Sequence, residues 1–173
     1  RLFELTESER MQLAAFYFNQ EQYADAASQY ALVQGKEKVK ALKNKVTCFK
    51  ELADYDQVLK LLAGDLEQFK FEDREQLYLI RAEAWFETNE LSKAKNDYLK
   101  ALEFNSQNGQ TLFALAELYE QEDKRTEAIR YYALASKEKR YRSASLMRQA
   151  RLLLMDKNGD LALQLAKQAT LSD

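Results

Sequence analysis

Small residues recur along this chain in pairs whose members lie 12 positions apart. The five pairs are Ala14 and Ala26, Val46 and Val58, Ala82 and Ala94, Ala116 and Ala128, and Ala150 and Ala162. Successive pairs follow at steps of 32, 36, 34 and 34 residues. A pattern that returns at a period of this length indicates an array in which copies of one supersecondary unit are stacked on each other.

The residues around each pair have the spacing of helices that bury one face. In the fourth copy the apolar positions follow i, i+3, i+4 and i+7 and continue on a second helix, at Leu112, Leu115, Ala116, Tyr119, Ala128, Tyr132 and Ala135. Two antiparallel helices can cross closely only where the side chains at the crossing are small. We therefore predict that each small pair marks the crossing point of a helical hairpin. We expect an aromatic side chain on the next helical turn to fill the space beside each crossing, at Tyr17, Phe49, Trp85 and Tyr119.

This pattern resembles the tetratricopeptide repeat (TPR) family, whose unit of about 34 residues places small and large apolar residues at the same positions. The resemblance covers nearly the whole chain, from about Glu7 to Asp173. It implies an all-α fold, a right-handed superhelical TPR-like solenoid of about five antiparallel helical hairpins, as a single array over residues 1–173. The expected repeats are residues 7–38, 39–74, 75–108, 109–142 and 143–173.

The second copy departs from the family pattern. It has Val46 and Val58 in both small positions and Asp65 where a third small residue is expected, so we predict wider helix packing in this hairpin. The chain also lacks the proline that the family often places at the end of the second helix. The second repeat is therefore expected to be the least regular.

The composition favours helices. The chain has four glycines and no proline, and 31% of its residues are charged. Polar residues that can cap a helix mark three expected helix starts, at Thr6, at Asn89 and at Ser106–Gln107–Asn108. The isolated glycines fall where the repeat register predicts turns.

Where the protein resides is left open by the sequence. No stretch of about 18 apolar residues is present that would span a bilayer, and no signal peptide is recognised. Because the first residues, Arg1–Leu2–Phe3, already lie within the repeat pattern, we expect the chain to be a fragment of a longer protein. Both the cytoplasm and a bacterial periplasm are compatible with this pattern.

The residue types that most often carry catalysis are missing. The chain has no histidine and a single cysteine, Cys48, which leaves no His-based general base, no Cys–His nucleophile pair and no usual zinc ligand set. Cys48 is expected to be a buried, inert thiol on a packed helix. No glycine-rich phosphate loop is present. We therefore expect no enzyme activity, no catalytic residue, no cofactor and no metal site.

Two basic runs raise nucleic-acid binding as an alternative, one over residues 36–50 and one over residues 137–151. The net charge of −2 and the pI of about 5.5 lack the broad positive field that supplies most non-specific affinity for a phosphate backbone. We expect these runs to be solvated and nucleic acid not to be a partner.

A stack of helical hairpins presents a binding surface, because the first helix of each hairpin lines its concave side. The register predicts a partner-binding groove formed by Met11, Phe18, Lys43, Asn44, Leu79, Ile80, Glu83, Phe86, Phe113, Glu117, Arg148 and Arg151. An apolar centre at Phe86 and Phe113 with acids at its edge suits a basic and apolar segment of a partner. The alternative is that these side chains pack within the protein.

The sequence thus predicts a non-catalytic protein–protein interaction scaffold that presents a concave groove to a partner peptide or domain. One alternative is a structural, self-assembly or spacer module, and self-association is left open. Another is an accessory segment of an export or assembly machine that binds a polymer such as a polysaccharide. The identity of the partner does not follow from the sequence.

Replacement of Ala116 by leucine tests the predicted crossing points. Because the added methylene groups would overpack the site, we expect Ala116→Leu to lower the free energy of unfolding by about 1–3 kcal/mol. Lys124→Ala, expected at the surface, should leave it nearly unchanged. Denaturant unfolding of the three proteins measures the difference, and equal stability of Ala116→Leu and the parent would show that the register is wrong.

Overall fold

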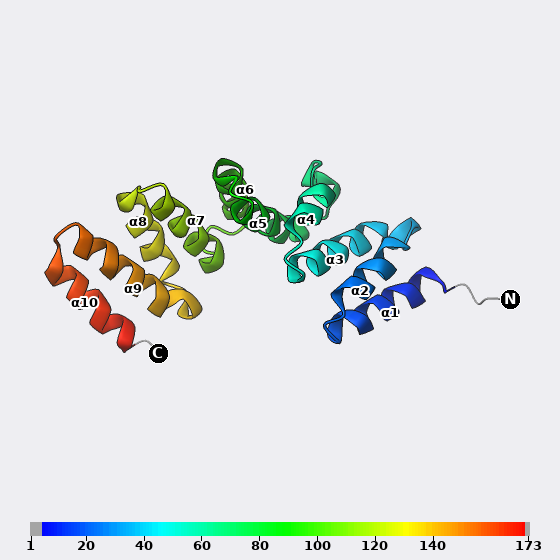
Figure 1. The fold of residues 1–173 in the computed structure, drawn as a ribbon, viewed down its shortest axis with the longest axis horizontal. Coiled ribbons are helices and arrows are strands. Elements are labelled where there is room, and N and C mark those ends of the chain that lie inside the picture. Colours follow the sequence, from blue (N-terminus) through cyan, green and yellow to red (C-terminus); the bar gives the residue numbers. More distant parts are fainter. Residues whose placement is uncertain (1–4, 172–173) are drawn as a thin grey trace. The chain divides into compact units, whose positions relative to one another are not determined.

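The computed structural model describes residues 5–171, and these hold ten α-helices and no strand. The helices are α1 (Glu7–Asn19), α2 (Tyr23–Ala31), α3 (Lys38–Glu51), α4 (Tyr55–Leu61), α5 (Phe71–Glu87), α6 (Leu91–Phe104), α7 (Gly109–Gln121), α8 (Arg125–Ala135), α9 (Lys139–Met155) and α10 (Gly159–Thr170) (Figure 1). Short 3₁₀ turns lie at Gly35–Glu37 and Leu66–Gln68. The all-α prediction is confirmed.

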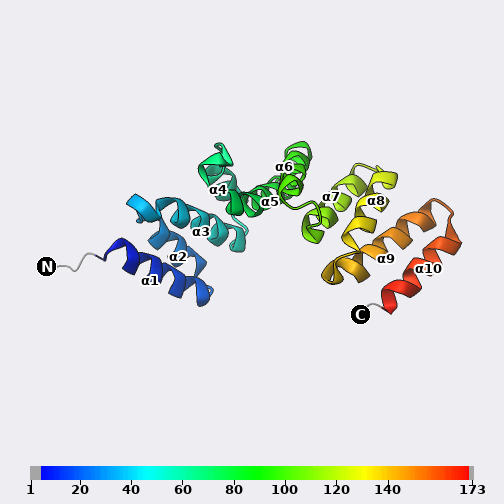
Figure 2. The ribbon, with the colours of Figure 1, turned by 180° about the vertical axis from the view of Figure 1, so that it is seen from behind.

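The chain divides into two compact units that meet in sequence after Glu90. The first unit contains α1 to α5 and the second contains α6 to α10. Within the first unit α1 lies beside α2, and within the second α9 lies beside α10, in both views of the molecule (Figure 1, Figure 2). Each unit therefore contains helices packed against their neighbours in the sequence.

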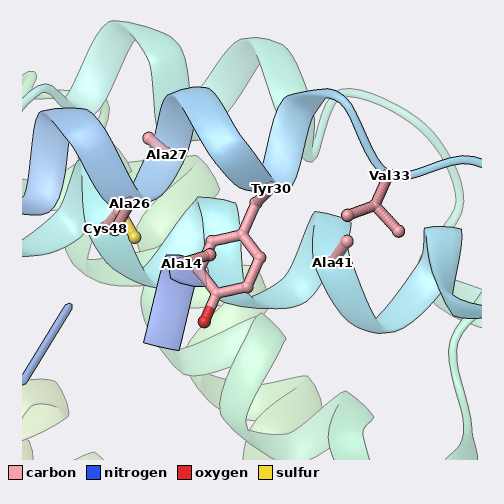
Figure 3. Packing of buried hydrophobic residues seen from close by; sticks show 7 residues of the cluster. All are labelled: Ala14, Ala26, Ala27, Tyr30, Val33, Ala41 and Cys48. Atoms are coloured by element: carbon pink, nitrogen blue, oxygen red, sulfur yellow. The ribbon is translucent and has the colours of Figure 1, made fainter. Parts of the chain in front are cut away.

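All ten residues of the small pairs are buried, and none is more than 5% exposed. In the first unit Ala14 and Ala26 belong to one buried cluster, which also contains Tyr30 (Figure 3). In the second unit Ala116 and Ala128 belong to another, together with Tyr132. This is the packing expected where two helices cross over small side chains.

Two of the expected helix starts are present. Thr6 and Glu9 form a capping box at α1, where the Thr6 N–H donates to Glu9 Oε2 at 2.7 Å and the Glu9 N–H donates to Thr6 Oγ1 at 3.3 Å. Asn108 caps α7, because its Oδ1 accepts from the Thr111 N–H at 2.9 Å. A helix also begins close to Asn89, at Leu91, but Asn89 does not cap it, because Asn89 follows the C-cap of α5 and has a φ of 62°.

One turn geometry ends the first helix of every repeat. The first residue after the C-cap has positive φ in all five cases, at Glu21, Ala53, Asn89, Asp123 and Lys157. The next N–H donates five residues back, to the carbonyls of Tyr17, Phe49, Trp85, Tyr119 and Leu153, at 2.8–2.9 Å. These are the hydrogen bonds of the Schellman motif. The five residues with positive φ are separated by 32, 36, 34 and 34 residues, as the small pairs are, so the turn is part of the repeat.

The irregularity of the second repeat lies in its second helix. Its turn at Ala53 has the common geometry, but α4 has only 7 residues. Two arginines of α5 hydrogen-bond to the carbonyl groups that follow α4. Arg81 Nη1 donates to Leu62 O at 2.8 Å, and Arg74 Nη2 donates to Glu67 O at 2.7 Å. These side chains satisfy carbonyls that a longer helix would have used.

The turn residue Ala53 is a site where glycine should stabilise the protein. Left-handed backbone costs a residue with a Cβ atom about 1–2 kcal/mol, and the greater freedom of glycine in the unfolded chain offsets about 0.4–1 kcal/mol of the gain. We expect Ala53→Gly to raise the free energy of unfolding by roughly 0.5–1 kcal/mol. Denaturant unfolding measures it.

Ala63 supplies the matched control, because it is exposed in the loop after α4 and has no positive φ. Ala63→Gly should lower stability by about 0.4–1 kcal/mol. If both glycine variants lose stability equally, the strain at Ala53 is absent.

Candidate functional site

A trough lies between α1 and α3 in the first unit. One cavity of about 390 Å³ is lined by Ser8, Met11, Gln12, Ala15, Tyr30, Glu37, Lys40 and Asn44. A second, of about 270 Å³, is lined by Ala15, Phe18, Asn19, Tyr30, Asn44 and Thr47. Because the two cavities share Ala15, Tyr30 and Asn44, they are adjacent, and we treat them together as one depression. We call it the α1–α3 trough.

Tyr30 of α2 forms the floor of the trough. Only 5% of the residue is exposed, and its ring lies next to Ala14 of α1 (Figure 3). Burial raises the pKa of the Tyr30 hydroxyl, and the neighbouring side chain of Asn44 acts in the opposite direction.

Two lysines of α3 form ion pairs with acidic residues of α5. Lys43 Nζ donates to Asp73 Oδ1 at 2.5 Å, and Lys50 Nζ lies 3.3 Å from Glu83 Oε2. Lys40, on the wall of the trough, has a side chain that is 66% exposed and lies 3.7 Å from the Glu37 carboxylate. The trough wall is therefore close to neutral, and its uncharged polar groups are amides and hydroxyls.

A network of acids, arginines and tyrosines joins α7, α8 and α9 in the second unit. Arg148 Nη2 lies 3.3 Å from Glu117 Oε1, and Arg151 pairs with Glu120. The Tyr132 hydroxyl donates to Glu120 Oε2 at 2.9 Å. Phe113 packs edge-on against Tyr132, with ring centroids 5.2 Å apart. Both carboxylates are thus matched by cations of the next repeat.

Burial dominates the electrostatics of this network. It raises the pKa of Glu117, and the charge of Arg148 acts in the opposite direction. Burial also raises the pKa of Tyr132, and the nearby carboxylate of Glu117 adds to this. The Tyr132 hydroxyl therefore remains a hydrogen-bond donor throughout the physiological pH range.

The structure separates the predicted groove residues by environment. Met11, Phe18 and Asn44 line the α1–α3 trough. Lys43, Glu83, Glu117, Arg148 and Arg151 take part in ion pairs within the protein.

Leu79 and Ile80 are only 7% and 3% exposed, within a run of four buried residues on α5, so they offer little surface to a partner. Phe86 and Phe113 are half-buried and belong to different units, so their shared role stays a prediction.

Sequence reasoning missed part of the trough. Tyr30 has the register of Tyr132, a position that the sequence assigns to hairpin packing, and it also forms the floor. Ser8, Gln12 and Asn19 were not selected, although with Ala15 they follow helical spacing on α1. That polar stripe beside Met11 and Phe18 is the signal from which they were predictable.

The part of the chain that the structure describes has no group of three or more His, Cys, Asp or Glu residues arranged to hold a metal ion. Cys48 is fully buried, and burial raises its pKa to about 11. Such a thiol is protonated at neutral pH, which is unfavourable for nucleophilic chemistry. Among residues 5–171, no helix is both long and apolar enough to cross a membrane.

Comparison with known proteins places the fold. No protein-family model and no curated protein sequence matches the chain. Solved structures do match. MamA superimposes with a TM-score of 0.81 at 16% identity, over 96% of this chain and 91% of that one. YrrB, described as a TPR protein with an unusual peptide-binding site, superimposes with a TM-score of 0.75 at 13% identity, over 97% and 87%.

PilF of Pseudomonas aeruginosa also matches, with a TM-score of 0.73 at 19% identity, over 94% of this chain and 74% of that one. The chain has a TPR fold. In TPR terms α1, α3, α5, α7 and α9 are first helices and α2, α4, α6, α8 and α10 are second helices. The trough is therefore formed by two successive first helices, with a second helix beneath them.

The pKa of Glu117 provides a test of the network of acids, arginines and tyrosines in the second compact unit. We expect carboxyl NMR titration to give a value above the usual 4.5, because burial disfavours the charged form. In Arg148→Met the value should rise further, because the lowering effect of the cation is lost. A value below 4.5 in the parent would show that Arg148 outweighs burial.

The direction in which stability changes with pH follows from the raised pKa of Glu117. A Glu117 pKa that is raised on folding gives a contribution to stability that is present below pH 4.5 and is lost as the pH rises through the folded-state value. The isosteric variant Glu117→Gln should lack this part of the pH dependence.

Proposed function

We propose that this TPR protein is a non-catalytic protein-interaction module and that the α1–α3 trough binds an extended peptide segment of a partner protein. The observation that carries the proposal is that two adjacent cavities share Ala15, Tyr30 and Asn44. A peptide that follows the trough would contact two successive first helices at once. The peptide-binding site described for YrrB provides a precedent on the same fold.

The lining of the trough suits a peptide in two ways. Met11, Phe18 and Tyr30 supply apolar surface for side chains of a ligand. Asn19 and Asn44 each carry a donor and an acceptor in one amide. An extended peptide leaves its own N–H and C=O groups without partners, and side-chain amides complement both.

The charges favour a segment whose centre is uncharged. Lys43 and Lys50 are matched by Asp73 and Glu83, and at one end of the trough Lys40 lies opposite Glu37. A strongly charged ligand would lose hydration without meeting a matching charge. The ion pair of Glu117 with Arg148 likewise weakens the earlier expectation of a basic segment. We infer a ligand with apolar side chains at its centre and polar ends.

Ala15 is the residue through which the trough can be blocked. It is exposed, lines both cavities and is the smallest side chain among their walls. Peptides selected from a random library against the parent protein serve as probes. Ala15→Trp should bind them at least about tenfold more weakly, a loss of about 1.4 kcal/mol, because the indole fills the space over Tyr30.

Ala24→Trp is the matched control, because Ala24 is exposed on α2 and lines neither cavity. It should bind the selected peptides with parental affinity, and both variants should show the parental circular dichroism and melting temperature. Equal binding by Ala15→Trp and Ala24→Trp would show that the trough is not the peptide site.

A further inference from the structure

The chain contains two Asn-Gly dipeptides, one formed by Asn108 and Gly109 at the start of α7 and one formed by Asn158 and Gly159 at the start of α10. An asparagine followed by glycine is prone to spontaneous deamidation, because glycine has no Cβ atom to hinder attack of its backbone nitrogen on the asparagine side chain. The two dipeptides have the same chemistry in an unfolded chain. Their surroundings in the folded chain are different.

Deamidation of an Asn-Gly pair needs water as its only co-reactant. The glycine N–H loses its proton and the nitrogen bonds to the asparagine Cγ, while the Cγ–Nδ2 bond breaks and Nδ2 leaves with a proton as ammonia. Water then opens the succinimide ring at either carbonyl, which gives aspartate or isoaspartate. Ring closure requires the glycine nitrogen to rotate about the asparagine Cα–C bond. A hydrogen bond or a packed neighbour that holds the glycine therefore slows the reaction.

Both reacting groups of the first pair are held. The Gly109 N–H donates to Glu138 Oε2 at 2.7 Å, and Asn108 Oδ1 accepts from the Thr111 N–H at 2.9 Å. Gly109 is buried, and a Cβ atom added to it would collide with Glu138 and the Tyr141 ring. The carboxylate also opposes loss of the Gly109 proton, because the amide anion would form next to a negative charge. The contact between successive repeats thus protects this pair.

Neither group of the second pair is held in this way. The Asn158 side chain caps no N–H of α10, and the Gly159 N–H has no side-chain acceptor among residues 5–171. Both residues are exposed, and a Cβ atom added to Gly159 would meet no other group within 4 Å. The first turn of a helix also opens at little cost in free energy. The Gly159 nitrogen is therefore free to rotate toward Asn158.

The exposure of Asn158 is a property of its position in the repeat. The residues at the same register in the earlier repeats are Gln22, Asp54, Glu90 and Lys124, and all four are exposed although further repeats follow them. A following repeat therefore leaves this position open to solvent.

We propose that Asn158 is a site of spontaneous deamidation and that Glu138 protects Asn108 from the same reaction. The turn between α9 and α10 uses both backbone groups of Asn158, because its N–H donates to Leu153 O at 2.8 Å and its C=O accepts from the Ala162 N–H at 3.2 Å. Isoaspartate adds a methylene group to the main chain between these two groups, which disturbs the turn. Either product also replaces a neutral amide by a carboxylate at the start of α10.

Peptide mass spectrometry of the parent chain, incubated at mildly alkaline pH, measures the rate at each site. In the folded protein we expect Asn158 to deamidate at least about tenfold faster than Asn108, because Asn108 reacts only after a local opening. In guanidinium chloride the two sites should react at similar rates, because glycine follows both. Equal rates at the two sites in the folded chain would overturn the proposal. So would an Asn158 that stays unmodified while the denatured chain reacts.

Two variants separate the causes. Gly159→Ala should slow the reaction at Asn158 at least about tenfold, because the methyl group hinders ring closure, and the open space around Gly159 lets the fold accept it. Glu138→Ala should speed the reaction at Asn108, and its Asn158 rate, expected at the parental value, is the internal control for folding. A parental Asn158 rate in Gly159→Ala, or a parental Asn108 rate in Glu138→Ala, would contradict the proposal.

Discussion

The close approach of paired helices over small side chains is the constraint on which the rest of this structure depends. Ala14 with Ala26 and Ala116 with Ala128 occupy buried clusters in which a larger side chain would force the helices apart. The turn that joins such helices has one geometry in all five repeats, with a left-handed residue and two backbone hydrogen bonds. Helix spacing and chain direction are therefore set locally, by residues of the repeat itself.

The α1–α3 trough is a consequence of that geometry. Tyr30 lies on a second helix and reaches the space between two first helices, where it forms a floor. Ala15 adds almost no bulk above the ring, and it lines both cavities. Lys40 is the lysine of α3 that lines the trough, where it lies near the Glu37 carboxylate, and Lys43 and Lys50 are paired with Asp73 and Glu83. The result is an apolar floor with amide walls.

The sequence predicted the features that depend on local period. The small pairs, the helical register and several trough residues could be found in this way, because a helix repeats its faces every 3.6 residues. The left-handed turn residues could not, because none of the five is a glycine. The ion pair of Lys43 with Asp73 joins residues 30 positions apart, and no local pattern reports which partner a flexible side chain finds. The burial of Leu79 and Ile80 depends on α5 being covered on more than one side.

The most direct test of the account is a nuclear Overhauser experiment on the protein saturated with a library-selected peptide. The account predicts contacts from the peptide to the Ala15 methyl group, the Tyr30 ring and the Asn44 side-chain amide, all of which border both cavities. Contacts confined to the exposed face of α2, or to residues of the second unit, would contradict it.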